Sequence, residues 1–219
     1  MRTIPFTFIL CILIGFGMNS MKAQDFDQDS TGLPGDNFSL QGALEMFKKA
    51  NSIEEFEKLI NTQSNNVNNL DLNEDGDIDY IRVIGKKEGD VHAFVLQVPI
   101  SENENQDIAV IELEKTGKET AMLQIVGDED IYGEQTIVEP TDEQESEKGE
   151  GADTEYLISK KAAVVVNVWL WPSVRFVYRP GYVVWVSPWR WKVYPGWWRP
   201  WRPLTWRVFH PLRWHYQPE

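Results

Sequence analysis

The chain has 219 residues, a formal net charge of −13 and a single cysteine. That cysteine, Cys11, lies in an apolar stretch near the N-terminus, so the rest of the chain offers no thiol for a disulfide, a cysteine nucleophile or a thiolate metal site. The sequence also contains no glycine-rich phosphate loop, nucleophile elbow or zinc-helix motif. We therefore expect a protein that is not an enzyme.

Residues 1–24 have the features of a secretory signal peptide. Arg2 precedes an apolar run from Ile4 to Phe16, and small and polar residues then lead to Ala23 and Gln24. The apolar run is shorter than the roughly 20 residues that a membrane-spanning helix needs. We predict that the chain is exported, with cleavage near residue 24 and a destination in the periplasm, at the outer membrane or outside the cell.

The rest of the chain divides into two parts of opposite charge. Residues 25–155 hold 33 acidic and nine basic residues, whereas residues 156–219 hold ten basic residues and one acidic residue. All ten tryptophans and eight of the twelve prolines lie in the second part. This break predicts an acidic domain at 25–138, a solvated acidic linker at 139–155 and a basic region at 156–219.

Two helices are predicted at the start of the acidic domain. Ser39 is placed to cap the first, and Ser52-Ile53-Glu54-Glu55 is a capping box for the second. Their apolar positions recur at helical spacing and are Leu40, Ala43, Leu44, Phe47, Ile53, Phe56 and Ile60. We expect both helices to cover one face of a sheet.

Alternating, β-rich runs follow near residues 78–86, 91–100, 107–115, 120–127 and 131–138. Short turn segments separate these runs, which favours an antiparallel meander because parallel strands need longer crossovers. The predicted fold class is α+β: two N-terminal helices packed on an antiparallel β meander, followed by a small β-hairpin and a Trp/Pro-rich extended C-terminal region.

Oxygen-bearing side chains alternate along the segment just before the first predicted strand, with Gly76 at the bend. Calcium takes six to eight oxygen ligands from a loop that curls around it. The expected ligands are the side chains of Asp71, Asn73, Asp75 and Asp79 and the carbonyl oxygen of Asp77. An ordinary turn rich in Asn, Asp and Gly is the alternative interpretation.

This run resembles the ion loop of EF-hands and, more closely, the aspartate-rich loop of integrin-type propeller repeats, over nine to twelve residues. The twelfth position is Arg82, where an EF-hand places a bidentate glutamate, and a strand-like run replaces the exiting helix. The resemblance implies an ion site and not the rest of either fold. Because the closing glutamate is missing, we expect a Ca²⁺ dissociation constant of about 10⁻⁴ to 10⁻³ M.

The basic region begins with a predicted hairpin, in which residues 174–178 pair with 182–186 around Arg179-Pro180-Gly181. Beyond it, prolines recur too often for a helix or a strand ladder, so we expect extended backbone. Tryptophans and arginines alternate in this tail. The residues expected to contact a partner or a membrane are Trp189, Trp191, Trp197, Trp198, Arg199, Trp201, Arg202 and Trp206.

Several interpretations of this tail stay open. Tryptophan beside arginine is typical of cation–π stacking and of lipid interfaces, so the tail either packs on itself or contacts a membrane surface or an anionic envelope polymer. A carbohydrate- or peptidoglycan-binding module is an alternative. The acidic and basic parts are also able to bind each other. Export argues against nucleic acid, and the protein partner is unknown.

The histidines are poorly placed for catalysis or metal binding. We expect His92 to be a surface or edge residue, and His210 and His215 are five residues apart in a tail that Pro211 interrupts. As a whole, the chain resembles exported Gram-negative envelope proteins of unknown function that combine an acidic domain with a Trp/Pro-rich basic end. The resemblance implies residence in the envelope and no activity. The function expected is that of a non-catalytic, calcium-stabilised envelope protein.

Overall fold

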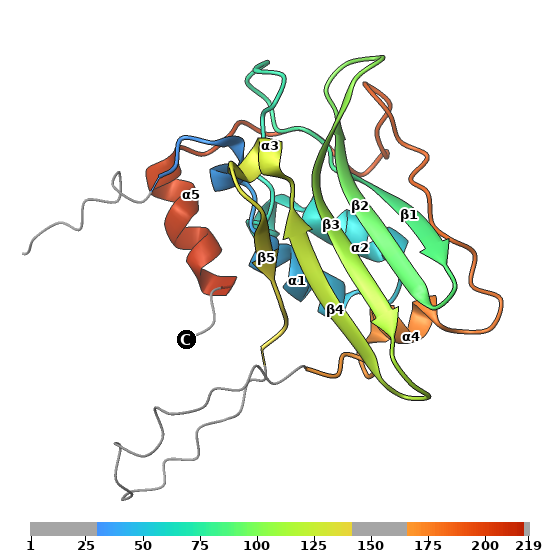
Figure 1. Cartoon of the computed structure of the whole chain (residues 1–219). Coiled ribbons are helices and arrows are strands. Elements are labelled where there is room, and N and C mark those ends of the chain that lie inside the picture. The colour runs from blue at the N-terminus through green and yellow to red at the C-terminus, as the bar shows by residue number, and fades with distance from the viewer. Residues whose placement is uncertain (1–29, 142–165, 217–219) are drawn as a thin grey trace, which may run out of the picture.

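The computed structural model describes residues 30–141 and 166–216. The predicted signal peptide and most of the predicted linker lie outside these ranges. A five-stranded antiparallel sheet with strand order β1-β2-β3-β4-β5 occupies the centre (Figure 1). Its strands are β1 (Arg82–Glu88), β2 (Val91–Pro99), β3 (Asn105–Lys115), β4 (Ala121–Gly127) and β5 (Thr136–Val138). The α+β class and the antiparallel sheet are confirmed.

Helices precede and follow the sheet. The α-helices are α1 (Leu40–Lys49), α2 (Ile53–Ile60), α3 (Glu129–Tyr132), α4 (Pro172–Val177) and α5 (Trp206–Arg213). Short 3₁₀ helices are η2 (Pro34–Asn37), η3 (Gln63–Asn65) and η4 (Trp214–Tyr216). Side chains from α1, α2, α4 and the sheet contribute to one buried core, so residues from both parts of the chain fold around it.

The two N-terminal helices begin where their caps predict. The side-chain oxygens of Ser39 and Ser52 accept hydrogen bonds from the backbone N–H groups of Gly42 and Glu55, respectively. Phe47 of α1 is fully buried, with its ring centroid 5.2 Å from that of Phe56 and 5.6 Å from that of Phe94 in β2.

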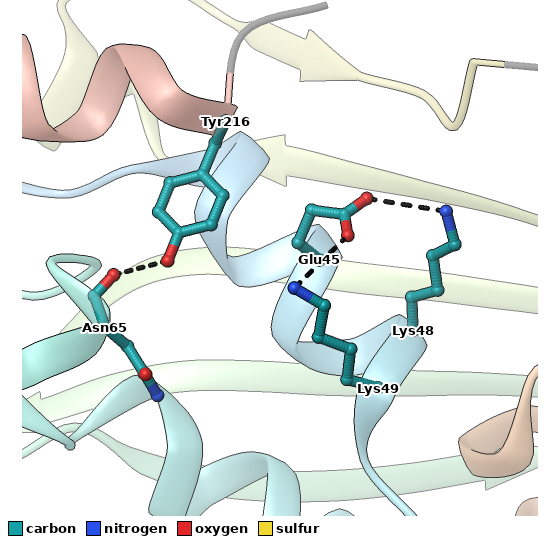
Figure 2. A network of polar contacts seen from close by, with 5 residues as sticks. All are labelled: Glu45, Lys48, Lys49, Asn65 and Tyr216. Carbon is teal, nitrogen blue, oxygen red and sulfur yellow. Dashed lines mark hydrogen bonds and ion pairs between the residues drawn. The ribbon is translucent and has the colours of Figure 1, made fainter. Parts of the chain in front are cut away.

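The C-terminal end of the described chain lies beside α1 (Figure 2). The Tyr216 hydroxyl donates a hydrogen bond to the Asn65 carbonyl oxygen, 151 residues earlier in the chain. On the outer side of α1, Glu45 forms ion pairs with Lys48 and Lys49 at 3.7 and 3.8 Å. These ion pairs lie within one helix, whereas the contact at Tyr216 between the two parts of the chain is a hydrogen bond.

The first strand begins four residues later than predicted. The backbone of residues 78–81 has no neighbouring strand among the described residues. The N–H groups of Ile78 and Asp79 donate to the carbonyl oxygens of Trp201 and Leu70, while Asn61 bonds both the N–H and the carbonyl oxygen of Ile81 and the Asn68 amide donates to the carbonyl oxygen of Asp79. Buried backbone groups need a partner of some kind, and here loop carbonyl oxygens and asparagine side chains supply it. The predicted strand 78–86 is therefore wrong in its first half.

The predicted last strand, 131–138, is wrong over its first five residues. Glu129–Tyr132 form the short helix α3, because the Asp128 side chain caps it by accepting a hydrogen bond from the N–H of Asp130. Gly133 ends the helix with a positive φ of 77°, which glycine adopts without steric cost. The strand that remains, β5, has three residues.

The predicted hairpin of 174–178 with 182–186 is also wrong. Residues 172–177 form helix α4, in which Pro172 sits at the first position, where its fixed φ suits a helix and its missing N–H costs nothing. Val174 and Val177, three residues apart, are buried on one face of α4. The β-branched composition favoured a strand, but burial of this face against the core outweighs that local preference.

Residues 182–187 run along the outer edge of β1 instead of pairing with 174–178. The Gly85 N–H donates to the Trp185 carbonyl oxygen at 2.8 Å, and the Ser187 N–H donates to the Val83 carbonyl oxygen at 3.0 Å. Val186 and Ile84 form an isolated antiparallel bridge. Glycine is required at position 85, because a Cβ there would lie 2.6 Å from the Trp185 oxygen.

The Trp/Pro-rich tail contains no helix or long strand between residues 188 and 205, but turns at residues 191–192 and 196–197 interrupt the extended backbone that the sequence predicts, and α5 then forms despite Pro211 within it. A proline in a helix interior costs about 3 kcal/mol or more. Phe209 and His210 are both buried on this helix, and their burial outweighs the lost hydrogen bond.

The sequence predicts that His92 is a surface or edge residue. This prediction is wrong, because His92 is fully buried. Its side chain lies on the same face of the sheet as Phe94, and its ring contacts those of Tyr178 and Tyr182 at centroid distances of 5.2 and 5.6 Å. The sequence prediction failed because these covering rings come from a segment about 90 residues away.

Candidate cation site and the C-terminal arm

Residues 71–79, here called the ion loop, turn their polar side chains toward their own backbone. The two carboxylate oxygens of Asp71 accept hydrogen bonds from the N–H groups of Asp75 and Gly76 at 3.1 and 3.0 Å. Asn73 Oδ1 accepts from the Asp75 N–H at 2.9 Å, and Asp75 Oδ1 accepts from the Asp77 N–H at 3.0 Å. The loop therefore closes on itself around alternating oxygen-bearing side chains.

Two positive φ angles produce the curvature of the ion loop. Gly76 has φ +85°, where glycine is favoured, and Glu74 has φ +58°, which is uncommon for a residue with a side chain. The glycine identified in the sequence is therefore required at the bend.

Asp79 closes the ion loop from the buried side. Its side chain is only 5% exposed and accepts hydrogen bonds from the Leu72 N–H at 2.6 Å and the Asn73 side-chain amide at 3.0 Å. The pKa of Asp79 is raised to about 6, mainly by burial and in addition by the negative charges of Asp71 and Asp75, while the hydrogen bonds from Leu72 and Asn73 oppose the rise. A cation bound among these carboxylates would relieve that repulsion.

The donor set suits calcium in kind. Among the described residues, no group of three or more His, Cys, Asp or Glu side chains is arranged as a ready metal site. Calcium, however, also takes amide oxygens, backbone carbonyl oxygens and water. Asp71, Asn73, Asp75 and Asp79 are joined by hydrogen bonds within the loop, while Asp77 is exposed and is expected to offer its carbonyl oxygen alone.

Residues 178–205, here called the C-terminal arm, hold the ion loop in place. The Ile78 N–H donates to the Trp201 carbonyl oxygen at 2.7 Å. Asn69, just before the loop, donates from its side-chain amide to the Leu204 carbonyl oxygen at 2.9 Å and accepts from the Leu204 N–H at 2.7 Å. The start and the end of the ion loop are thus both bonded to the same distant segment.

Aromatic rings connect the ion loop to the arm. The Tyr80 ring lies 5.2 Å from that of Trp198 and 6.0 Å from that of Tyr194, and Tyr194 lies 4.7 Å from Trp198. Trp198 is only 3% exposed, which makes it part of the protein interior. Aromatic pairs at these distances contribute roughly 0.5–1.5 kcal/mol beyond the area that they bury.

The residues that were expected to contact a partner differ in exposure. Trp198 is buried and is wrong as a free contact residue, because Tyr80 and Tyr194 cover it. Trp197, Arg199 and Arg202 are exposed. Trp189, Trp191, Trp201 and Trp206 are half-buried. The spacing of residues in a Trp/Pro-rich tail does not indicate which tryptophans are buried and which are exposed, because tertiary contacts bring the rings that cover Trp198 into place.

Sequence reasoning missed the buried carboxylate of Glu57, in α2. Oε1 accepts hydrogen bonds from the hydroxyls of Tyr80 and Ser187 at 2.8 and 2.9 Å, and Oε2 accepts from the Val83 N–H and the Trp185 indole N–H at 2.9 and 3.0 Å. Burial raises the pKa of Glu57 in spite of these four donors. The only sequence signal was a glutamate within a predicted apolar helix face, which was too weak to identify it.

A cavity of about 460 Å³ opens beside the ion loop. Its lining comes from three segments of the chain: residues 30–37, residues 69–74 and residues 203–206. Polar side chains of Asn37 and Asn69 and the indole of Trp206 share its wall with Asp71 and Glu74. This volume is in the range that small ligands occupy in proteins.

Comparisons of the chain with protein-family models, curated proteins and solved structures found no match. The resemblance to exported envelope proteins therefore stays a prediction. In the ranges 30–141 and 166–216, no helix has the length and apolar character that crossing a bilayer requires.

Proposed function

We propose that this chain is an exported, non-catalytic envelope protein in which Ca²⁺ orders the ion loop and the C-terminal arm contacts an anionic surface. The proposal keeps the predicted arrangement in which α1 and α2 cover one face of the meander, which the ring contact between Phe47 and Phe94 supports.

The observation that carries the calcium proposal is the alternation of oxygen-bearing side chains along the ion loop, which closes on itself through their hydrogen bonds. Asp71 and Asp75 both act on the buried carboxylate of Asp79, whose charged form is disfavoured there in the absence of a cation. A divalent ion would neutralise this cluster. Because the loop is bonded to the arm through Trp201 and Leu204, ordering the loop would also stabilise the arm.

Thermal melting of matched variants tests this proposal. We expect the melting temperature of the wild type to rise in millimolar Ca²⁺, because an ion that binds only the folded state stabilises it. Asp75→Asn removes one ligand charge and should abolish most of that rise. Asp77→Asn is the control, since this exposed side chain is not a predicted ligand. An equal Ca²⁺ response in both variants would contradict the assignment of ligands.

The charge of the C-terminal arm supports the contact with an anionic surface. Residues 178–205 contain five arginines and lysines and no acidic residue, although the chain as a whole is acidic. Trp197, Arg199 and Arg202 are exposed on this arm. Exposed cations beside exposed aromatic and apolar side chains favour binding to negatively charged interfaces.

Export is tested by the mass of the protein recovered from cells. We expect the mature chain to lack residues 1–24 and to fractionate outside the cytoplasm. A full-length, cytoplasmic protein would contradict this part of the proposal.

A second candidate function, binding of carbohydrate or peptidoglycan fragments, is favoured by the cavity beside the ion loop. Trp206 is an aromatic residue of the kind that sugars stack on, and the Asn37 side chain in the same wall supplies a polar partner. Titration with soluble glycan fragments while following tryptophan fluorescence tests it, with Asn37→Ala as the variant expected to weaken binding. No fluorescence change in the wild type would contradict this candidate.

A further inference from the structure

Basic residues that are far apart in the sequence lie together at one edge of the sheet. Strand β1 carries three of the nine basic residues of the acidic part: Arg82, Lys86 and Lys87. The C-terminal arm bonds to this same strand through the Gly85–Trp185 and Ser187–Val83 hydrogen bonds. The first part of the arm, residues 178–193, therefore lies at the β1 edge of the molecule, on the opposite side from α5 (Figure 1), and it contains three cations: Arg179, Arg190 and Lys192.

The charge of this edge contrasts with the rest of the protein. Residues 82–90 and 178–193 together contain six basic residues, and their acidic residues are Glu88 and Asp90. Residues 25–155 as a whole, by comparison, hold 33 acidic residues against nine basic ones. A negatively charged partner is therefore attracted to the β1 edge more strongly than to the acidic remainder of the chain.

Apolar side chains are exposed along the same edge. Val183 is 83% exposed and Val186 is 56% exposed, although Val186 bridges Ile84 of β1 through the backbone. Val193, further along the arm, is 42% exposed. Single exposed apolar side chains are common on protein surfaces, but Val183 and Val186 lie three residues apart in a segment that also carries cations, an arrangement that suits a partner able to cover both kinds of group.

We propose that the β1 edge, formed by β1 and residues 178–193 of the arm, binds the surface of an anionic phospholipid bilayer. This inference rests on the proposed contact between the arm and an anionic surface, and it names the partner and the residues. Lys86, Lys87 and the arm cations meet the lipid phosphates, and Val183 and Val186 enter the boundary between headgroups and acyl chains. A hydrated polyanion would satisfy the cations but leave the valines exposed, which is why the geometry favours lipid.

Co-sedimentation of the full protein with vesicles tests the proposal. One set of vesicles contains equal parts of phosphatidylglycerol and phosphatidylcholine, and the other contains phosphatidylcholine alone. We expect binding to the anionic vesicles that weakens as salt is added. Val183→Glu should weaken it by roughly tenfold or more, and Lys87→Gln by about fivefold, since each cation near the surface contributes about 1 kcal/mol.

Matched controls lie away from this edge. Val208, which is 51% exposed on α5, is changed to Glu, and the exposed Lys118 in the β3–β4 turn is changed to Gln. Neither change should weaken binding by more than about twofold. All four positions are exposed, and an unchanged melting temperature checks that each variant is folded.

The outcomes separate this inference from the proposed function. If the wild type binds anionic vesicles and Val183→Glu behaves like Val208→Glu, the β1 edge is the wrong surface, while the anionic contact stands. If the wild type binds dextran sulfate and not the vesicles, the partner is a polymer and the lipid proposal is overturned. If it binds neither at low salt, both proposals fail.

Discussion

Glu57 is the residue on which three segments of the chain meet. Its carboxylate accepts hydrogen bonds from Tyr80 just after the ion loop, from Val83 in β1, and from Trp185 and Ser187 in the arm. Removing a buried acceptor leaves its donors without partners, which is costly because they have already lost their contact with water. The side chain thus determines how firmly the arm is held.

We predict that Glu57→Ala lowers the free energy of unfolding by about 2–4 kcal/mol, because it leaves four donors unpaired. Glu57→Gln should cost about 1 kcal/mol or less: its amide oxygen accepts from the two N–H groups, while the hydroxyls of Tyr80 and Ser187 rotate to accept from its amide N–H₂. Urea denaturation measures both. Equal losses for the two variants would contradict this reading of the network.

His92 makes stability depend on acid pH. Both ring nitrogens lack hydrogen-bond partners among the described residues. The pKa of His92 is lowered to about 4, mainly by burial and also by the charge of Lys87, while Asp90 opposes the change. An unfolded histidine takes up its proton near pH 6.5. The contribution of the neutral ring is therefore complete above pH 6.5 and is lost as the pH falls toward 4.

We predict that between pH 7 and pH 4.5 the wild type loses roughly 1–3 kcal/mol more of its free energy of unfolding than His92→Phe does. Phenylalanine keeps the ring contacts and has no proton to bind. Comparing the two proteins removes the effects of Glu57 and Asp79, which are present in both. Parallel pH profiles would show that His92 does not account for the acid sensitivity.

Among elements, the contact between β1 and the arm depends on a single glycine. A Cβ at position 85 would lie 2.6 Å from the Trp185 oxygen and 2.9 Å from the Val184 side chain, both closer than normal contact.

We therefore predict that Gly85→Ala displaces the arm and lowers the free energy of unfolding by about 1–3 kcal/mol, the usual cost of overpacking a close contact. Trp185 should become more exposed, which acrylamide quenching of tryptophan fluorescence detects. Gly196→Ala is the matched control within the arm, because a Cβ there meets nothing within 4 Å and its φ is not positive. Greater quenching in the control than in Gly85→Ala would count against this account.

The sequence predicts elements well where their determinants are local. The serine caps at residues 39 and 52, the helical spacing after them and the turns between β1 and β4 are all local signals, and these elements form. Prediction from the sequence fails where groups far away along the chain determine the local structure. Asn61 and Asn68 replace a strand partner for residues 79–81, and the core buries Val174 and Val177 as a helix face.

The same distinction applies to the candidate site. The ion loop is a local motif, and its hydrogen-bonded closure around Asp71 and Asp75 follows from the spacing of its oxygens and from Gly76. Other features of the site depend on contacts between residues more than 100 positions apart. These are the hydrogen bond from Ile78 to Trp201, the packing of Tyr80 on Trp198, and the bonds that Glu57 accepts from Trp185 and Ser187. Periodicity carries no information about such contacts.

At the scale of the whole molecule, the acidic and basic parts share their interior. Val168 donates its N–H to the Ala121 carbonyl oxygen, and Val168, Val174 and Val177 are buried in the core that the acidic part builds. The described contacts between these parts include hydrogen bonds, aliphatic and aromatic packing, and cation–π contacts such as that of Lys58 with Trp197, and the ion loop lies at their junction. An ion that stabilises the loop therefore acts on the entire protein.

Calorimetric titration of the purified protein with Ca²⁺ tests this claim most directly. We predict the binding of one ion per chain with a dissociation constant of about 10⁻⁴ to 10⁻³ M. Asp71→Asn should abolish the heat, because Asp71 offers both carboxylate oxygens to the loop. A wild-type protein that takes up no Ca²⁺ at millimolar concentration, or an Asp71→Asn variant that binds as the wild type does, would contradict the account.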